Sequence, residues 1–260
     1  MPDLSPSAPG APLNLRRVTY AEDPTIRATI FQEVKVPSWP EFMFHDPWAN
    51  ELWHFLQEDF AEYQFIFRDD AGATIAVGHT LPFRWDRPLE ELPENGWDGI
   101  MRKAVVDLQA GRTPNMLTAI EATVIPAHRG SGLSKRVIGE MRMIAQARGF
   151  QTLVAPVRPS LKSRYPTTPI ERYVEWKSDD GLPFDPWLRT HARLGARLVK
   201  IARESMTIPG SVADWETWAG MRFPESGEYV VPGALVPVRI DREVDRGLYV
   251  EPNVWMAHGV

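Results

Sequence analysis

Hydrophobic and polar positions along the chain repeat with two periods, which predicts a protein that mixes helices and strands. Apolar residues recur at helical spacing after Asp46-Pro47, where Asp is a suitable N-cap and Pro suits the first helical turn. The pattern predicts a helix over about Pro47 to Glu62. Asp23-Pro24 and Asp185-Pro186 carry the same start signal and predict two more helices, the later one ended by Gly195.

The middle of the chain predicts a strand, a helix and a second strand in succession. Met116 to Ile125 is an apolar run closed by a proline, and Thr152 to Val157 is another. Between them, Leu133 to Arg148 has apolar residues on one helical face, and Gly149 is a helix-ending residue. This spacing forms a βαβ unit, whose two strands are expected to lie parallel in one sheet.

Shorter signals surround this unit and complete the expected α/β fold, a central mixed sheet flanked by helices. They predict a strand over Leu15 to Tyr20, a hairpin of Phe65 to Phe67 with Thr74 to Pro82, a helix over Trp97 to Leu108, a short helix capped by Ser211, and strands over Ser205 to Ile208, Tyr229 to Val231, Leu235 to Ile240 and Leu248 to Val254.

The same patterns indicate one domain over residues 14–260, including a β-rich C-terminal extension from about residue 209. Residues 1–13 are rich in Pro, Ser and Ala and are expected to form a disordered arm. They lack the basic start and apolar run of a signal peptide. No run of the chain approaches the roughly 18 apolar residues of a membrane span.

Composition narrows the classes of function. The net charge of −5 lacks the basic excess typical of nucleic-acid-binding proteins. The absence of cysteine excludes a thiol nucleophile, disulfides and thiolate metal sites. The six histidines show no metal-ligand spacing. We therefore expect a cytoplasmic protein without a metal, a nucleic-acid partner or a membrane anchor.

The link between the first strand and the helix of the βαβ unit carries the main chemical signal. It contains two glycines at alternate positions, Gly130 and Gly132, and opens directly into the helix. Unpaired N–H groups and the positive dipole end make a helix N-terminus an anion site, and glycines let a ligand approach the backbone. The glycine spacing is neither that of a P-loop nor that of a dinucleotide fold. The segment predicts a phosphate or diphosphate cradle, unless the glycines serve only a tight turn.

This segment resembles the acyl-CoA motif of the GNAT (N-acetyltransferase) superfamily. In that motif a strand ending Val-x-Pro precedes Arg-x-x-Gly-x-Gly/Ala at the start of a helix. The chain has Val124-Ile125-Pro126 and then Arg129-Gly130-Ser131-Gly132-Leu133-Ser134, with serine at the last small position. The order of elements from Asn14 to Ile208 is also similar, with an insertion over Arg158 to Phe184 before the late helix. The resemblance implies a GNAT-like fold whose motif strand and next strand splay apart to admit pantetheine.

The resemblance also implies which residues hold the cosubstrate. The residues expected to bind it are Thr123 and Val124 for the pantetheine thioester, and Arg129, Gly130, Ser131, Gly132, Leu133 and Ser134 for the diphosphate. A backbone N–H near Val124 would polarise the thioester carbonyl. The donor is then acetyl-CoA or another acyl-CoA, or the phosphopantetheine thioester of an acyl carrier protein, and the sequence leaves these donors open.

Transfer to an amine calls for a general base, because only about one primary amine in 10³ is neutral at pH 7. Glu121 on the motif strand is the first candidate. Strand alternation groups it with Ala119 and Thr123 on one face, although a bulge would change this. A merely solvated or salt-bridged carboxylate is the alternative.

A general acid should protonate the departing thiolate. Many members of the family use a tyrosine four residues before the glycine that ends the late helix, and here that residue is His191. A buried structural histidine is the alternative, and Tyr165 and Tyr173 in the insertion are reserve acids. Nearby, Arg189, Arg193 and Arg197 form a basic stripe that is either solvated or contacts a phosphate or an acidic carrier protein.

These features predict an acyltransferase that moves an acyl group from a pantetheine thioester to a small-molecule amine, as natural-product pathways do. The insertion over Arg158 to Phe184 and the C-terminal tail, with the region from Trp39 to Trp53, are expected to enclose this acceptor. They would alternatively form an oligomer interface, such as that of a homodimer. Two other functions stay open, a non-catalytic acyl-CoA-binding or sensor protein and a protein N-acetyltransferase.

Overall fold

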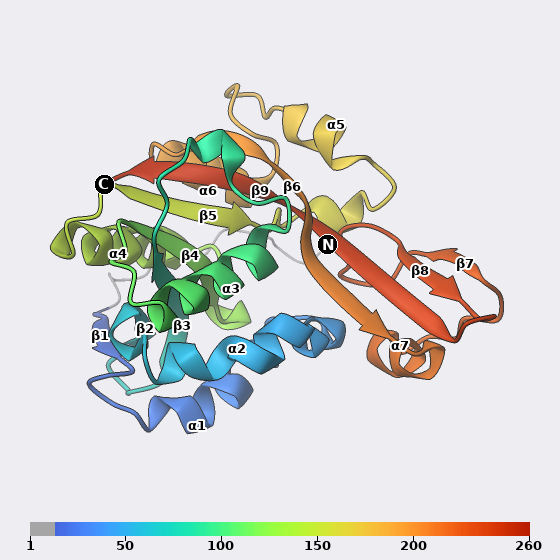
Figure 1. Ribbon diagram of the computed structural model, residues 1–260, viewed down its shortest axis with the longest axis horizontal. Helices are drawn as coiled ribbons and strands as arrows, with labels where there is room; N and C mark the ends of the chain where they lie inside the picture. Colours follow the sequence, from blue (N-terminus) through green and yellow to red (C-terminus); the bar gives the residue numbers. More distant parts are fainter. Residues whose placement is uncertain (1–13) are drawn as a thin grey trace, which may run out of the picture.

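The computed structural model describes residues 14–260, so the arm expected over residues 1–13 lies outside the described residues (Figure 1). Nine strands of the described part form one mixed sheet in the order β1-β2-β3-β4-β5-β9-β8-β7, and β6 pairs with β9. The strands are β1 (Arg16–Thr19), β2 (Gln64–Arg68), β3 (Thr74–Phe83), β4 (Met116–Val124), β5 (Thr152–Val157), β6 (Arg197–Gly210), β7 (Gly227–Tyr229), β8 (Val238–Asp241) and β9 (Arg246–Gly259). This arrangement confirms the expected mixed α/β class.

Helices flank the sheet. They are α1 (Ile26–Ile30), the π-helical turn η1 (Phe31–Lys35), the 3-10 turn η2 (Glu41–His45), α2 (Pro47–Gln57), α3 (Gly96–Gln109), α4 (Leu133–Ala147), α5 (Ile170–Glu175), α6 (Pro186–Arg193) and α7 (Val212–Ala219), with further one-turn 3-10 segments η3 (Ala61–Tyr63), η4 (Leu89–Glu91), η5 (Pro126–His128) and η6 (Lys162–Arg164). Between residues 14 and 260, no helix is both long enough and apolar enough to cross a membrane.

Side-chain caps fix the starts of three helices as the sequence predicts. Asp46 Oδ1 accepts a hydrogen bond from the Ala49 amide at 2.8 Å at the start of α2. Asp185 caps α6, and Ser211 forms a reciprocal capping box with Asp214 at the start of α7. The first helix differs from the prediction.

At that first helix, the carboxylate of Asp23 accepts the Thr25 amide at 3.1 Å, and α1 begins only at Ile26. The prediction for the end of α2 was also wrong. The helix stops at Gln57, because the chain then turns and the Phe60 amide donates to the Phe55 carbonyl at 2.9 Å. Phe60 still packs in the core, so apolar spacing continues beyond the helix itself.

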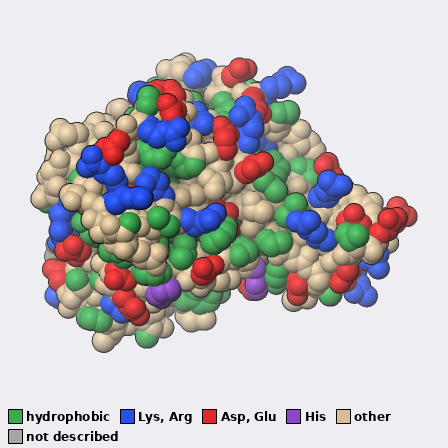
Figure 2. Space-filling model, viewed as in Figure 1, with side chains coloured by type: hydrophobic (Ala, Val, Ile, Leu, Met, Phe, Trp, Pro, Cys, Tyr) green, Lys and Arg blue, Asp and Glu red, His purple; other side chains and the backbone are tan. Residues whose placement is uncertain are grey.

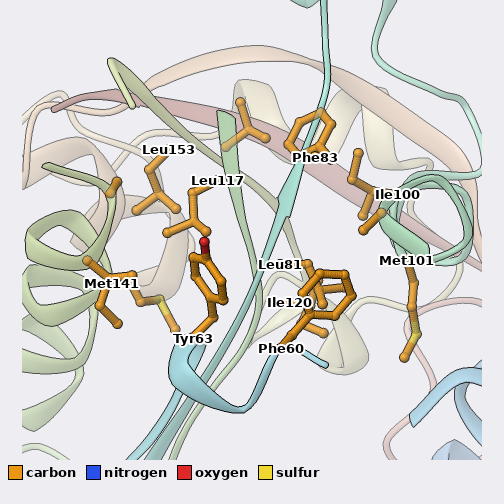
Figure 3. Close-up of a cluster of buried hydrophobic side chains, with 14 of the residues drawn as sticks. Phe60, Tyr63, Leu81, Phe83, Ile100, Met101, Leu117, Ile120, Met141 and Leu153 are labelled. Carbon is orange, nitrogen blue, oxygen red and sulfur yellow. The ribbon is translucent and has the colours of Figure 1, made fainter. Parts of the chain in front are cut away.

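The core lies where α3 and α4 meet the centre of the sheet. In Figure 3, Met141 of α4 lies on the same side as Leu117 and Leu153, while Ile100 of α3 lies on the opposite side, near Phe83. All five side chains are buried in one hydrophobic cluster. Burial of each such side chain stabilises the fold by about 1.5–3 kcal/mol, which anchors β4 and β5 against the helices.

Strands β4 and β5 are parallel, as the βαβ pattern predicts, but they pair over a very short length. Their register covers Leu117 opposite Leu153 and Thr118 opposite Val154. Beyond these pairs, β4 continues along β3, and β5 continues along β9. The two strands therefore diverge, and a gap opens between residues 119–124 of β4 and residues 155–157 of β5.

The C-terminal residues complete the centre of the sheet. In Figure 1, β6 and β9 are long strands that cross the molecule and lead to α7 and the β7–β8 hairpin at one end. The last residues of β9 pair with β5 on one side and β6 on the other. The sequence predicted only shorter pieces here, over Ser205 to Ile208 and Leu248 to Val254.

Candidate active site

A cavity of about 650 Å³ lies at the gap between β4 and β5. Its wall includes residues 119–124 of β4 and residues 155–157 of β5, together with side chains of the segment from Arg27 to Gln57. The start of α4 and its preceding loop contribute Arg129 and Ser134. This volume is typical of sites for small ligands.

Glu121 of β4 lies on the cavity wall within a network of polar contacts. Its side chain is 7% exposed, and Lys35 Nζ lies 3.2 Å from Oε2. His79 Nε2 lies 3.6 Å from the same oxygen. Thr123 Oγ1 donates to Oε1 at 2.9 Å and itself accepts from Trp39 Nε1 at 3.1 Å. Both carboxylate oxygens are therefore engaged.

Burial and charge decide the protonation of this network. Burial favours the neutral form of Glu121, but Lys35, His79 and the hydrogen bond from Thr123 together outweigh it and lower the pKa of the carboxyl. Burial lowers the pKa of Lys35 against the opposing effect of Glu121. Burial also lowers the pKa of His79 to about 3. At neutral pH, Glu121 is thus an ionised carboxylate beside a neutral imidazole.

A bulge in β4 sets the direction of Glu121. His79 of β3 stands opposite Glu121, and the next residue, Thr80, stands opposite Ala119, so Ile120 is the extra residue. The strict alternation expected from the sequence is therefore wrong at this point, and residues 119–124 all line the cavity. Glu121 nevertheless stays on the cavity wall.

The loop before α4 leaves its backbone amides uncapped. Gly130 and Gly132 adopt positive φ values of 80° and 84°, and a Cβ at either position would meet nothing within 4 Å. No side chain caps α4, and in the part of the chain that is described the amides of residues 130–132 donate to no other group. Ser131 Oγ turns away to donate to the His128 carbonyl at 2.6 Å. The loop can therefore hold an anion.

The expected cosubstrate residues fall into two groups in the structure. Thr123, Val124, Arg129 and Ser134 line the cavity. Residues 130–132 are exposed at the loop, where their backbone amides are available to a ligand. Leu133 differs, because its side chain is buried in the core and only its amide is available.

His191 of α6 also lines the cavity and is 3% exposed. Its Nδ1 lies 2.9 Å from Nε2 of His258, and its own Nε2 has no hydrogen-bond partner within residues 14–260. Burial, with the neighbouring His258, lowers the pKa of His191 to about 3. Burial and the charge of Arg142 lower the pKa of His258 to about 4. Both rings are neutral at pH 7, and one proton lies between them.

Tyr165 does not line the cavity, so the structure does not support it as a reserve acid. Its ring packs with Trp176 at a centroid distance of 5.0 Å and with Phe184 at 5.9 Å. The neighbouring Tyr173 donates its hydroxyl to Asp185 Oδ2 at 2.9 Å. These aromatic side chains pack in a hydrophobic cluster that also includes residues of β5, β9 and α6.

The part of the cavity wall formed by the segment from Arg27 to Gln57 includes four aromatic side chains. It includes Trp39 and Trp53 from the region expected to line the site. The insertion contributes only its first residues, Arg158 and Ser160, and the C-terminal tail contributes Asn253. The expectation that the insertion as a whole encloses the acceptor is therefore wrong, because most of it packs away from the cavity.

The three arginines of the basic stripe are engaged within the protein. Arg197 belongs to β6, so the stripe is no continuous helical face, and it pairs with Glu90 at 3.2 Å. Arg193 pairs with Asp180 at 2.6 Å, and Arg189 donates to two backbone carbonyls. Figure 2 shows that Asp and Glu side chains also lie beside several of the Lys and Arg side chains on the face of the molecule in view.

Sequence reasoning missed three members of the site, Lys35, His79 and His258. Each reaches its partner only through tertiary structure, with Lys35 and His79 converging on Glu121 and His258 contacting His191. The predicted hairpin could have flagged His79 as a strand residue, but the register with β4 was needed to place it opposite Glu121. No local pattern marks Lys35.

Comparisons with known proteins agree with this geometry, although no family model matches the chain. The loading GNATL domain of CurA from Lyngbya majuscula has a TM-score of 0.57 at 18% identity, covering 96% of this chain and 98% of that one. The GphF GNAT-like decarboxylase, in complex with isobutyryl-CoA, has a TM-score of 0.52 at 16% identity, covering 95% and 98%. These two similarities show the fold.

A relative with higher sequence identity shows the family as well as the fold. Arginine N-acetyltransferase avaD of Aspergillus versicolor is 36% identical over 271 residues, which cover 93% of this chain and 93% of that protein. Identity at this level over nearly the whole length of both chains agrees with the splayed strands, the uncapped loop and the carboxylate on β4. The chain belongs to the GNAT superfamily and is an N-acyltransferase of that superfamily.

Proposed function

We propose that the protein transfers an acetyl group from acetyl-CoA to an amine of arginine or a close analogue. The proposal rests on the 36% identity to the arginine N-acetyltransferase across 93% of both chains. The cavity supports it, because the carboxylate of Glu121 and the aromatic side chains on its wall suit a cationic acceptor.

The donor side favours a CoA ester. The amides of residues 130–132 and the N-terminus of α4 fit a diphosphate, which CoA carries. A carrier protein presents the same pantetheine arm on a single phosphodiester and needs a docking surface. The arginines of the basic stripe are already paired, which favours CoA over a carrier protein.

The proposed reaction assigns a proton role to each side of the cavity. Glu121 removes a proton from the acceptor ammonium, directly or through water, and the neutral amine attacks the thioester carbonyl. A C–N bond forms, and a β4 backbone N–H near Val124 stabilises the developing oxyanion. The C–S bond then breaks, the remaining proton of the attacking nitrogen passes to the leaving thiolate, and the Nε2–H of the neutral His191 stabilises that thiolate by a hydrogen bond.

That role of His191 requires one arrangement of the shared proton. His258 must donate from Nε2 to His191 Nδ1, which leaves a hydrogen on His191 Nε2 for the cavity. Burial keeps both rings neutral, so this donor persists through the range of a normal assay.

The acceptor is tested by incubating the protein with acetyl-CoA and a panel of amines while measuring thiol release and product mass. Arginine should give the highest kcat/KM, and citrulline, which has the same shape without the charge, should fall at least about tenfold below it. Agmatine and ornithine test the carboxylate and the guanidinium. If arginine is inert while another amine is acetylated, the acceptor is wrong. CoA binding without any turnover would favour the non-catalytic alternative.

A further inference from the structure

Lys35 places a buried ammonium at the proposed base, and no step of the proposed reaction accounts for it. It ends the π-helical turn η1, a rare element that often occurs at functional sites. Its side chain is 12% exposed, and Nζ lies 3.2 Å from Glu121 Oε2. The same ammonium lies 3.3 Å from the centre of the Trp53 ring. Placing a long cationic side chain here costs desolvation and side-chain entropy.

The other groups that face Glu121 carry no positive charge at neutral pH. His79 of β3 is neutral because burial lowers its pKa to about 3. Tyr20, whose hydroxyl lies 3.5 Å from His79 Nε2, stays neutral because burial raises its pKa. Thr123 contributes a hydroxyl. The charge of Arg27 of α1 acts on Tyr20. For the described residues, Lys35 is the cation paired with Glu121.

We propose that Lys35 is a positioning residue whose ammonium keeps the Glu121 carboxylate ionised and fixed on the cavity wall, ready to accept the proton of the acceptor. The inference rests on the proposed function, with Glu121 as the base. Without the ammonium, burial would dominate, and the carboxyl would hold a proton to higher pH. A protonated carboxyl cannot serve as the base.

The test compares Lys35→Met, which removes the charge at similar length, with Lys35→Arg, which keeps it. The pH dependence of kcat/KM is measured with one acceptor for all variants, so the acceptor's own ionisation is common to them. The acid limb of Lys35→Met should move up by at least about one pH unit, so that activity is reduced about tenfold at a pH on the acid limb and recovers at higher pH. Lys35→Arg should keep the acid limb near that of the natural protein.

A second readout does not depend on turnover. Infrared difference spectra at a pH on the acid limb of Lys35→Met should show a protonated carboxyl band in that variant that is absent from the natural protein at the same pH and disappears in Lys35→Met/Glu121→Gln. Lys35→Gln should behave like Lys35→Met and serves if that variant folds poorly, while acetyl-CoA binding by calorimetry should stay unchanged. An unshifted acid limb together with no carboxyl band would overturn the proposal. If the band appears but the natural protein acetylates no amine, the coupling of Lys35 to Glu121 holds and the proposed function fails.

Discussion

At the residue scale, the neighbours of two buried groups in one cavity decide whether each group carries a charge. Glu121 stays ionised because Lys35 lies 3.2 Å away, whereas His191 has a neutral histidine as its neighbour and loses its charge. Environments that push titratable groups apart in this way are typical of acid and base pairs. At pH 7, Glu121 is therefore a carboxylate that can accept a proton, and His191 is a neutral imidazole that can donate a hydrogen bond.

Replacing Glu121 by Gln should remove the base while keeping the shape of the side chain. We expect kcat to fall by about 10²–10⁴ at pH 7, as for other general bases, with acetyl-CoA affinity little changed. Steady-state kinetics and calorimetry measure the two effects. Glu140→Gln is the matched control, since Glu140 pairs with Arg17 at 3.2 Å and does not line the cavity. Equal kcat values in both variants would rule out Glu121 as the base.

His191→Phe should keep the aromatic volume and remove the hydrogen-bond donor. We expect kcat to fall by about 10²–10⁴ for an acceptor whose reaction is limited by loss of the thiolate. His258→Gln keeps an amide N–H near the former Nε2 and should retain more activity than His191→Phe. Kinetics with acetyl-CoA measure both. A His191→Phe variant with normal kcat would identify His191 as a structural histidine, the alternative that the sequence left open.

Two buried carboxyl groups, Asp46 and Asp98, make the stability of the fold depend on pH. Burial and the nearby Asp46 raise the pKa of Asp98 to about 9. Asp98 Oδ1 and Asp46 Oδ2 are buried with no hydrogen-bond partner among residues 14–260, and a proton shared between the two carboxyl groups would satisfy both. Asp98 therefore takes up a proton on folding at pH 7. Its contribution to stability is greatest below the unfolded pKa of about 3.8 and declines as pH rises toward 9.

Asp98→Asn should remove this dependence, because an amide can replace the protonated carboxyl as donor. Asp98 Oδ2 accepts the Thr207 amide at 3.0 Å, and the amide oxygen of Asn can do the same. We expect the variant to be more stable than the natural protein at pH 8, by about 1–4 kcal/mol in urea unfolding, with a smaller difference at pH 5. A variant that is less stable at pH 8 would contradict the shared proton.

At the element scale, local signals predicted starts better than ends. Asp46, Asp185 and Ser211 cap their helices because an N-cap acts within a few residues. The end of α2 depends on a turn stabilised by tertiary packing. The last part of β9 is buried between two strands and shows no alternation, which is why the sequence did not predict it past Val254.

The glycine loop allows a test with a matched control on the same helix. Gly132→Ala should cost about 1–2 kcal/mol of stability, because its φ is 84°, and should weaken acetyl-CoA binding through the added methyl. Gly139→Ala lies within α4, where a Cβ also meets nothing within 4 Å. It should stabilise the helix by up to about 1 kcal/mol and leave binding unchanged. Thermal unfolding and calorimetry separate the two, and normal CoA affinity in Gly132→Ala would argue against the cradle.

At the scale of the whole molecule, the site joins parts of the chain that lie far apart. Lys35, Glu121 and His191 come from η1, β4 and α6, and His258 comes from the last strand. The sequence alone identified the donor loop and β4 because their signals are local. The contacts of Lys35 and His258 depend on the order of strands and on β9 lying beside β5, which no local pattern specifies.

Three buried histidines should couple the stability of the whole fold to pH. Burial lowers the pKa of His79 and His191 to about 3 and that of His258 to about 4. In the unfolded chain these histidines have pKa values of about 6.5. Below that pH the unfolded chain therefore binds more protons than the folded protein. Their contribution to stability is present above about pH 6.5 and is lost as pH falls toward the folded values.

The expected slope is large enough to measure. Between about pH 6 and 5 the three sites together should reduce the free energy of unfolding by up to about 4 kcal/mol per pH unit, and His258→Gln should reduce the slope by about 1.4. Asp98 titrates in the opposite sense, so urea unfolding is compared in the Asp98→Asn background. Because His191 and His258 share one proton, His258→Gln also reports on the site. An unchanged slope in His258→Gln would mean that His258 is charged in the fold, and His191 would then receive its proton from an imidazolium.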